Sequence, residues 1–106
     1  MKYRLLILGV IAIFMAGCEE EIPGPDEVFM NGYKFTPASI TVSEGTTVTW
    51  TNKESVDHTV TSDTTGIFDS GTLSKRKSFS YLFTTTGTYN YHCSFHSNMK
   101  GTVIVE

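Results

Sequence analysis

The residues most able to do chemistry in this chain lie in one short stretch near its C-terminal end. Cys93, His96 and Met99 follow one another at intervals of three residues, and His58 lies upstream at the start of a strand-like segment. A thiolate, two imidazoles and a weakly held thioether are the donors of a copper ion that changes oxidation state. Zinc ordinarily takes four stronger nitrogen, sulfur or carboxylate donors. The residue types therefore favour copper over zinc.

These residues also have a purely structural interpretation. In that interpretation Cys93 is a small buried hydrophobic residue, Met99 fills the core, and the histidines lie on the surface. It leaves the spacing of the four residues unexplained. The metal site is therefore the stronger hypothesis.

Residues 89–101 read YNYHCSFHSNMKG, and this stretch resembles the ligand loop of the small cupredoxins, which are type 1 blue copper proteins. Its short spacing resembles the amicyanin and plastocyanin-like group, and within it the amicyanin type. The resemblance continues in family order over nearly the whole domain, through residues 35–37, 40–42, 45, 48–52, 57–60, 68–71 and 79–81. It implies one type 1 copper held by His58, Cys93, His96 and axial Met99.

The chain departs from the family pattern beside two of these residues. Phe95 and Ser97 flank His96, where amicyanins have prolines. Thr59 follows His58, where amicyanins and plastocyanins commonly have an asparagine that helps to tie the two ligand loops together. Hydrogen bonding to the thiolate, and with it the redox potential, is expected to differ.

The first residues have the pattern of an export signal. Lys2 and Arg4 precede an apolar run from Leu5 to Ala16, which is shorter than the roughly 20 residues that cross a bilayer. The run ends in AGC at residues 16–18, which resembles the lipobox of bacterial lipoproteins. Residues 1–17 are thus interpreted as a lipoprotein signal and Cys18 as the lipidated residue. An ordinary cleaved secretory signal is the alternative.

Removal of residues 1–17 leaves 89 of the 106 residues, which suits one small domain. Six Lys and Arg stand against eleven Asp and Glu in that part, a formal net charge of −5. This charge disfavours nucleic acid as a partner, and the domain is expected to be a monomer. Lipidation of Cys18 leaves Cys93 as the sole thiol, so no disulfide can form within the chain. Metal binding would protect that thiol in an oxidising compartment.

The rest of the chain is predicted to be one domain on a tether. Residues 18–27 are acidic and contain proline, and they are interpreted as the tether. Residues 28–106 alternate apolar with polar positions and show no helical periodicity. We expect an all-β fold, a two-sheet Greek-key β-sandwich of seven to eight strands. Turns are expected at Gly45, Gly71, Gly87 and Gly101.

Alternation along the strands places the candidate ligands. Tyr89, Tyr91 and Cys93 point to one face and His92 to the other, so His92 is not expected to be a ligand. His58 should point inward at the first residue of its strand and meet Cys93 at one end of the sandwich. His96 and Met99 are expected in the connection between the last two strands.

For three further features, a structural role is the main expectation. Met30 and the aromatic residues around Trp50 are expected to pack in the core. The basic run Lys75-Arg76-Lys77 is expected to be a solvated turn. A sharper hypothesis is that this run orients the domain towards an acidic partner or anionic lipid.

The site leaves several functions to be weighed. A closed set of four ligands suits a one-electron carrier, not an enzyme, at the extracytoplasmic membrane surface. In the family the electron passes through the exposed edge of the loop histidine, so redox partner proteins should dock near His96. Copper delivery, buffering or resistance is the alternative, although no additional Met or His cluster is present. A multicopper enzyme would need more histidines than His92, and a purely adhesive module would leave the ligand set unexplained.

Overall fold

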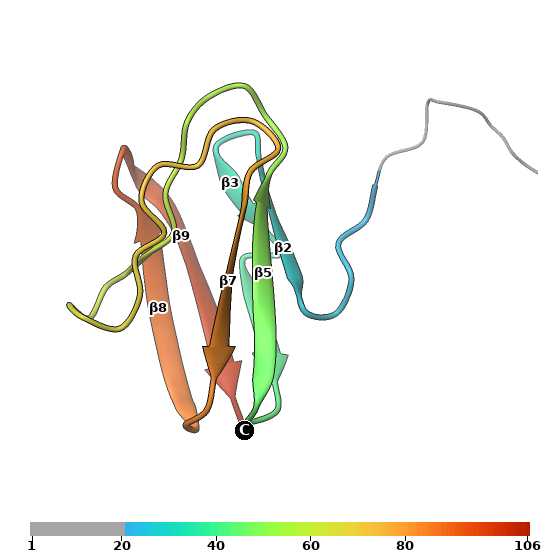
Figure 1. Cartoon of the computed structure of the whole chain (residues 1–106), viewed down its shortest axis with the longest axis vertical. Helices are drawn as coiled ribbons and strands as arrows, with labels where there is room; N and C mark the ends of the chain where they lie inside the picture. The colour runs from blue at the N-terminus through green and yellow to red at the C-terminus, as the bar shows by residue number, and fades with distance from the viewer. Residues whose placement is uncertain (1–20) are drawn as a thin grey trace, which may run out of the picture.

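The computed structural model describes residues 21–106, and these residues form eight strands and no helix (Figure 1). The predicted signal and Cys18 lie outside the described residues. The strands are β2 (Glu27–Asn31), β3 (Lys34–Thr36), β4 (Ser39–Val42), β5 (Thr46–Asn52), β6 (Thr61–Ser62), β7 (Ser78–Phe83), β8 (Gly87–Cys93) and β9 (His96–Val105). In residues 21–106 there is accordingly no helix long and apolar enough to cross a membrane. The strand β2 begins at Glu27, the last residue of the predicted tether.

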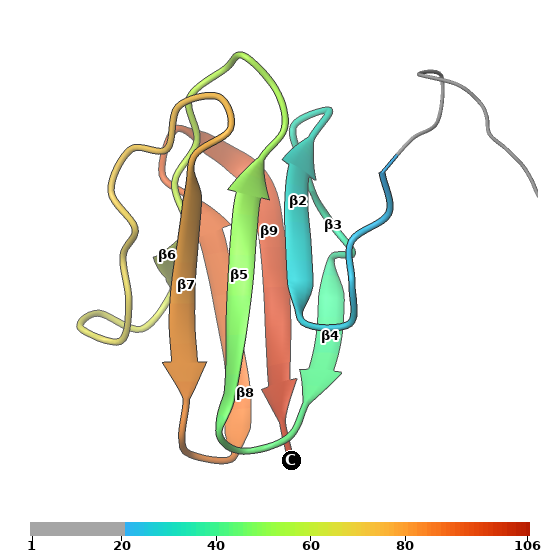
Figure 2. The same cartoon turned by 45° about the vertical axis from the view of Figure 1, so that its right-hand side comes forward.

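The strands form two sheets of four that pack face to face (Figure 2). The strand orders are β3-β2-β5-β7 in one sheet and β4-β9-β8-β6 in the other. The pairs β2–β5 and β4–β9 are parallel, and the other pairs are antiparallel. The prediction of an all-β sandwich of two sheets is confirmed.

Alternating residues of these strands form the core between the sheets. Val48, Trp50 and Asn52 of β5 are fully buried, as the predicted alternation requires. On β8, Tyr91 and Cys93 are buried while Asn90 is exposed. Met30 is buried on β2, as expected. The core therefore extends without interruption to Cys93, the last residue of β8.

One predicted turn is wrong, because Gly101 lies inside β9 and pairs with Tyr91 of β8. A Cβ atom at this position would lie 2.3 Å from the Tyr91 ring. The glycine is thus required for close packing and not for a turn. A glycine in the sequence does not by itself indicate whether it forms a turn or allows close packing within a strand.

The two ends of the sandwich differ. The ligand end, at the top of Figure 1, is where β8 ends at Cys93 and β9 begins at His96. The turns after β2 and β5 and the turn before β7 lie at the same end. The far end holds the C-terminus, where Glu44 N–H donates to the Glu106 carbonyl. All of the candidate ligands therefore belong to one end of the molecule.

Candidate metal centre

Three of the predicted ligands converge at the ligand end. The Cys93 Sγ atom lies 3.7 Å from His58 Nδ1 and 3.5 Å from His96 Nδ1. One ligand atom from each residue lies within 4.8 Å of the others. Cys93 and His58 are fully buried, and His96 is half-buried. Met99 is buried close to the other three.

These distances fit a bound metal ion. Donor atoms about 2.0 to 2.3 Å from one ion, and about 120° apart around it, are separated by about 3.7 Å. The Cys93 sulfur lies at nearly this distance from each of the two Nδ1 atoms. A thiolate with two imidazoles in a trigonal arrangement and a thioether nearby is the donor set of a blue copper site. The residues present therefore fit copper.

His58 is fixed through its backbone and through its ring. Its backbone pairs with that of Leu73: the His58 nitrogen lies 3.1 Å from the Leu73 oxygen, and the Leu73 nitrogen lies 2.7 Å from the His58 oxygen. Its Nε2 lies 2.6 Å from Glu54 Oε2. A hydrogen bond from Nε2–H to this carboxylate leaves the Nδ1 lone pair directed towards Cys93. His58 thus precedes β6 and is held by a bridge, not by the regular strand that was predicted.

Glu54 connects His58 to a neighbouring turn. Its carboxylate also accepts the backbone N–H groups of Gly32 and Tyr33, at 3.2 and 3.1 Å. Burial alone would raise the pKa of Glu54, but the hydrogen bonds from His58, Tyr33 and Gly32 hold this pKa below its ordinary value. Glu54 was not among the residues that the sequence pattern indicated. A carboxylate four residues before a candidate histidine ligand is the signal that could have indicated it.

Cys93 is tied to the His58 segment through Thr59. The Thr59 backbone N–H donates to Cys93 Sγ at 3.4 Å. The Thr59 hydroxyl accepts the backbone N–H of Ser94 at 2.8 Å. Threonine therefore makes the connection between the two ligand segments here. The Cys93 thiolate thus has a backbone N–H donor.

His96 and Met99 both lie within β9, so the expectation that they belong to a loop is wrong. Only Ser94 and Phe95 separate β8 from β9. The Tyr33 ring packs edge-on against His96, with 4.9 Å between the ring centroids, and against His58 at 5.9 Å. The His96 ring is thus held between Tyr33 and the buried Cys93.

The other candidate residues lie elsewhere. His92 points away from Cys93, and its Nδ1 lies 2.5 Å from an Asp63 carboxylate oxygen. Lys75 and Arg76 form an exposed turn before β7. Within residues 21–106, the cluster of His58, Cys93 and His96 is the one group of His, Cys, Asp or Glu arranged to hold a metal ion.

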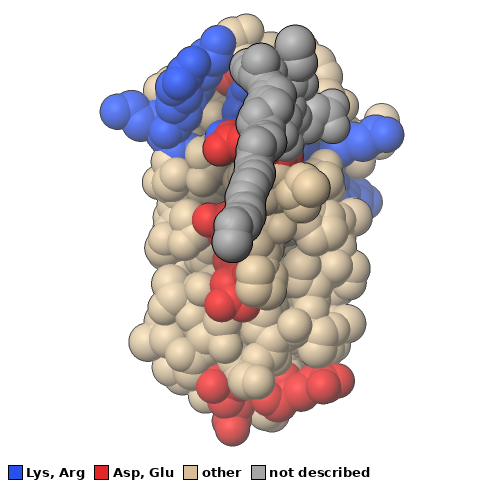
Figure 3. Space-filling view, turned by 90° about the vertical axis from the view of Figure 1, so that its right-hand side faces the viewer, with Lys and Arg blue, Asp and Glu red and all other residues tan. Residues whose placement is uncertain are grey.

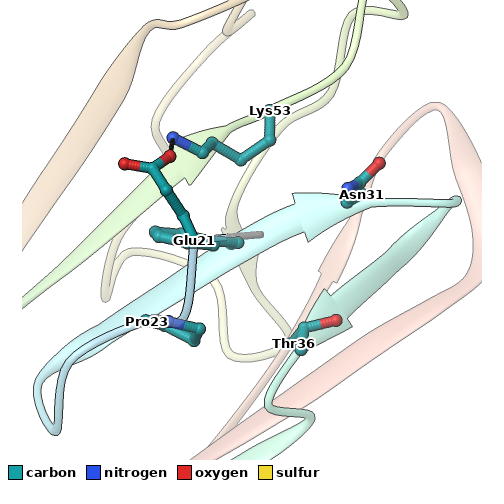
Figure 4. A pocket seen from close by; sticks show the side chains of 6 residues that line it. Glu21, Pro23, Asn31, Thr36 and Lys53 are labelled. Carbon is teal, nitrogen blue, oxygen red and sulfur yellow. Dashed lines mark ion pairs between the residues drawn. The ribbon is translucent and has the colours of Figure 1, made fainter. Parts of the chain in front are cut away.

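A surface hollow over β2 is separate from this centre (Figure 4). Glu21 and Lys53 form an ion pair at its edge, and the Lys53 ammonium lies 4.7 Å from the centroid of the Phe29 ring. The hydrogen bond and charge of Lys53 lower the pKa of Glu21. None of the candidate ligands lines this hollow.

Sequence comparisons place this chain among known proteins. The family model of the cupredoxin-like domain matches residues 5–105. Amicyanin from Paracoccus denitrificans is 37% identical over 78 residues, which are 69% of this chain and 59% of that protein. Amicyanin-alpha from Methylorubrum extorquens is 34% identical over 98 residues, which are 83% of this chain and 77% of that protein. Plastocyanin from Scenedesmus fuscus is 34% identical over 84 residues, 68% of this chain and 86% of that protein.

Solved structures agree with these matches. The reduced state of an amicyanin mutant has a TM-score of 0.72 and 35% identity, and the match covers 78% of this chain and 83% of that one. A purple cupredoxin from Nitrosopumilus maritimus has a TM-score of 0.72 and 33% identity, covering 76% of this chain and 98% of that one. The Cu(I) form of a further amicyanin mutant also has a TM-score of 0.72, with 34% identity and coverage of 82% and 87%. The sequence matches and the structural matches therefore lead to the same group of proteins, and the geometry of the candidate ligands is consistent with both.

Proposed function

We propose that this chain, which belongs to the cupredoxin-like family and binds one type 1 copper, carries single electrons between partner proteins. The observation that carries the proposal is the position of Cys93 Sγ, within 3.7 Å of two imidazole nitrogens. When bound, the copper supplies a one-electron couple. Cys93, His58, His96 and Met99 together leave no coordination position for a substrate.

The protein's contribution is to hold the ligand atoms still. Cys93 ends a paired strand, and His96 and Met99 lie in the strand paired with it. His58 is held through its backbone by Leu73 and through its ring by Glu54. Ligands fixed in this way change little in position between two oxidation states. A small rearrangement favours fast electron exchange.

His96 offers the route to the surface. Its ring is half-buried, and Phe95 beside it is 52% exposed. In the family that the sequence resembles, the electron passes through the corresponding histidine edge. We therefore place the exchange with partner proteins at His96.

The location of the protein is a proposal based on its first residues. The apolar run from Leu5 to Ala16 and the lipobox-like AGC support export and lipidation of Cys18. The protein would then face the periplasm or the cell exterior, held to the membrane by its lipid. Mass spectrometry of the protein from the membrane fraction should give the mass of residues 18–106 plus the lipid. The Cys18→Ser variant should appear in the soluble fraction. A membrane-bound Cys18→Ser variant would contradict the anchor.

The first test of the function is spectroscopic. Cu(II) is added to the purified protein and to Cys93→Ser, and visible absorption and electron paramagnetic resonance are recorded. We expect an intense blue colour with narrow copper hyperfine splitting in the protein, and loss of both in the variant. A pale, weakly bound copper that the substitution scarcely alters would contradict the proposal.

Electrode measurements then separate electron transfer from copper delivery. A carrier should give a reversible one-electron wave and retain its copper against chelators. Irreversible behaviour with rapid loss of copper to a chelator would favour delivery or buffering instead.

A further inference from the structure

We propose that the ligand end docks onto an acidic protein surface, by means of a ring of cations around His96. This inference rests on the proposed function, because it names the kind of partner with which electrons are exchanged. The ring is formed by all of the Lys and Arg side chains of residues 21–106, namely Lys34, Lys53, Lys75, Arg76, Lys77 and Lys100.

Strand register places these six residues at one end. Lys34 is in the pair that closes the β2–β3 turn, opposite Asn31. Lys53 directly follows β5, and the Lys77 carbonyl accepts the backbone N–H of Asn52 at 3.0 Å. Lys100 pairs with His92, one residue before the Cys93 ligand. Four segments that are distant in sequence thus bring positive charge to the ligand end.

The opposite half of the domain has the opposite charge. Figure 3 shows Lys and Arg side chains only near the ligand end of the visible face, whereas Asp and Glu side chains lie among them, along the middle and, as a group, at the far end. Glu44 and Glu106 belong to the far end, where Glu44 N–H donates to the Glu106 carbonyl. The whole chain has a formal net charge of −3. The charge at the ligand end is therefore opposite in sign to that of the protein as a whole.

Most of these cations are free to meet a partner. Lys53 pairs with Glu21, but the other five are exposed and make no ion pair within the described part of the chain. Four carboxylates lie at the same end, and Glu21 and Asp63 are both exposed there. Glu54 is largely buried against His58, while Asp57 is exposed. Six cations thus stand against three exposed carboxylates at this end of the described chain, and the charge there is positive overall.

An apolar centre lies within the ring. Tyr33 is 51% exposed and Phe95 is 52% exposed, and both line a shallow hollow with His96 and Met99. An apolar centre with a charged rim is the anatomy of a protein–protein interface. A lipid surface against this end would cover the His96 edge and block electron exchange. The geometry therefore favours a protein over a membrane.

Small redox probes test the sign of the charge at the site of transfer. Reduced copper protein is oxidised by hexacyanoferrate(III), an anion, and by tris(phenanthroline)cobalt(III), a cation, at increasing salt. Steering by the cations should make the rate with the anion fall several-fold between about 10 mM and about 200 mM salt. The net negative charge of the protein alone would produce the opposite trend. A rate with the anion that rises with salt would overturn the proposal.

A matched pair of variants locates the effect. The first is Lys75→Gln, Arg76→Asn and Lys77→Gln together, with asparagine chosen because Arg76 has a φ of 70°. The second is Thr84→Glu, Thr85→Glu and Thr86→Glu, three exposed positions at the far end. Both variants change the net charge by the same amount. Only the first should reduce the low-salt rate with the anion, by about threefold or more, and equal effects of both would overturn the proposal.

Binding gives a readout that is independent of electron exchange. A fluorescent oligoglutamate peptide should bind the copper protein at low salt, and the first variant should weaken this binding at least threefold while the second does not. Vesicles of phosphatidylglycerol and of phosphatidylcholine test the membrane. Selective loss of vesicle binding in the first variant, with peptide binding unchanged, would assign the cations to lipid and overturn the proposal.

The two probes distinguish failure of the proposed function from failure of the cation ring. If the copper protein exchanges electrons with neither probe, the proposed function fails. If it exchanges electrons with both probes but the variants have equal salt dependence, the function stands and the cation ring is not a docking surface.

Discussion

The ligand end and the aromatic core of this domain treat polar atoms in opposite ways. At the ligand end, Nε2 of His58 contacts Glu54, and Cys93 Sγ accepts the Thr59 N–H. In the core, Trp50 Nε1 and Tyr91 Oη are buried with no hydrogen-bond partner among residues 21–106. The difference indicates two tasks. Directed contacts set the ligand geometry, whereas the middle of the sandwich is held by packing.

The core is built mainly from aromatic rings. Trp50 lies 5.4 Å from Tyr91 and 5.8 Å from Phe68, between ring centroids. Phe83 contacts the same group at 6.3 Å from Trp50. Large aromatic side chains bury much apolar area each, so they dominate the stability of a small core. Changes of shape here should be more costly than changes of polarity.

The largest effect on stability is expected from Gly101→Ala. The new methyl group would lie 2.3 Å from the Tyr91 ring, which Trp50 and Phe35 hold in place. Overpacking of this kind costs about 2 to 3 kcal/mol. Urea unfolding of the copper-free protein measures it. Lys100→Ala, at the exposed neighbouring position of β9, is the matched control and should cost far less.

A double-mutant cycle tests the cause of that loss. Tyr91→Leu removes the atoms that the methyl group would meet, so the cost of Gly101→Ala should fall in that background. An equal cost in both backgrounds would show that the strand, and not the ring, rejects the methyl group.

A smaller loss, of copper affinity, is expected from Glu54→Ala. This change removes the acceptor for His58 Nε2 and for the Gly32 and Tyr33 N–H groups. Loss of such an orienting partner weakens metal binding about tenfold, or about 1.4 kcal/mol. Competition with a chelator measures it, and Asp57→Ala is the control because it removes an exposed carboxylate from the same segment. Wild-type affinity in Glu54→Ala would mean that the Leu73 bridge alone orients His58.

The sequence allowed the cluster of candidate ligands and the sandwich to be predicted because both leave local signals. Cys93, His96 and Met99 lie close together in the chain, and alternation along β8 indicates which way Cys93 points. Contacts between distant segments leave no such signal. The pairing of Gly101 with Tyr91 is one example, and the contact of Glu54 with the turn at Tyr33 is another. These two contacts become visible only when the pairing of the strands and the path of the turns are known.

Thr59, the residue after His58, shows the same limit of prediction from sequence. The residue type predicted that hydrogen bonding near the thiolate would differ. In the structure the Thr59 backbone N–H donates to Cys93 Sγ, and the Thr59 hydroxyl accepts the backbone N–H of Ser94. A backbone donor depends on the path of the chain, so the type of side chain at position 59 did not indicate it.

The smallest effect is expected from Tyr91→Phe, and it tests the contrast between the two regions directly. Burial raises the pKa of Tyr91 to about 12, an effect that the neighbouring Trp50 indole opposes in part, and the Tyr91 hydroxyl makes no hydrogen bond within residues 21–106. Removing an unpaired buried hydroxyl should leave the free energy of unfolding unchanged or raise it by up to about 1 kcal/mol. Tyr89→Phe is the matched control, because the Tyr89 hydroxyl donates to the Thr85 carbonyl at 2.7 Å and its loss should be destabilising. If Tyr91→Phe instead costs as much as Tyr89→Phe, the core hydroxyl has a partner in solution, and directed polar contacts stabilise both regions of the domain.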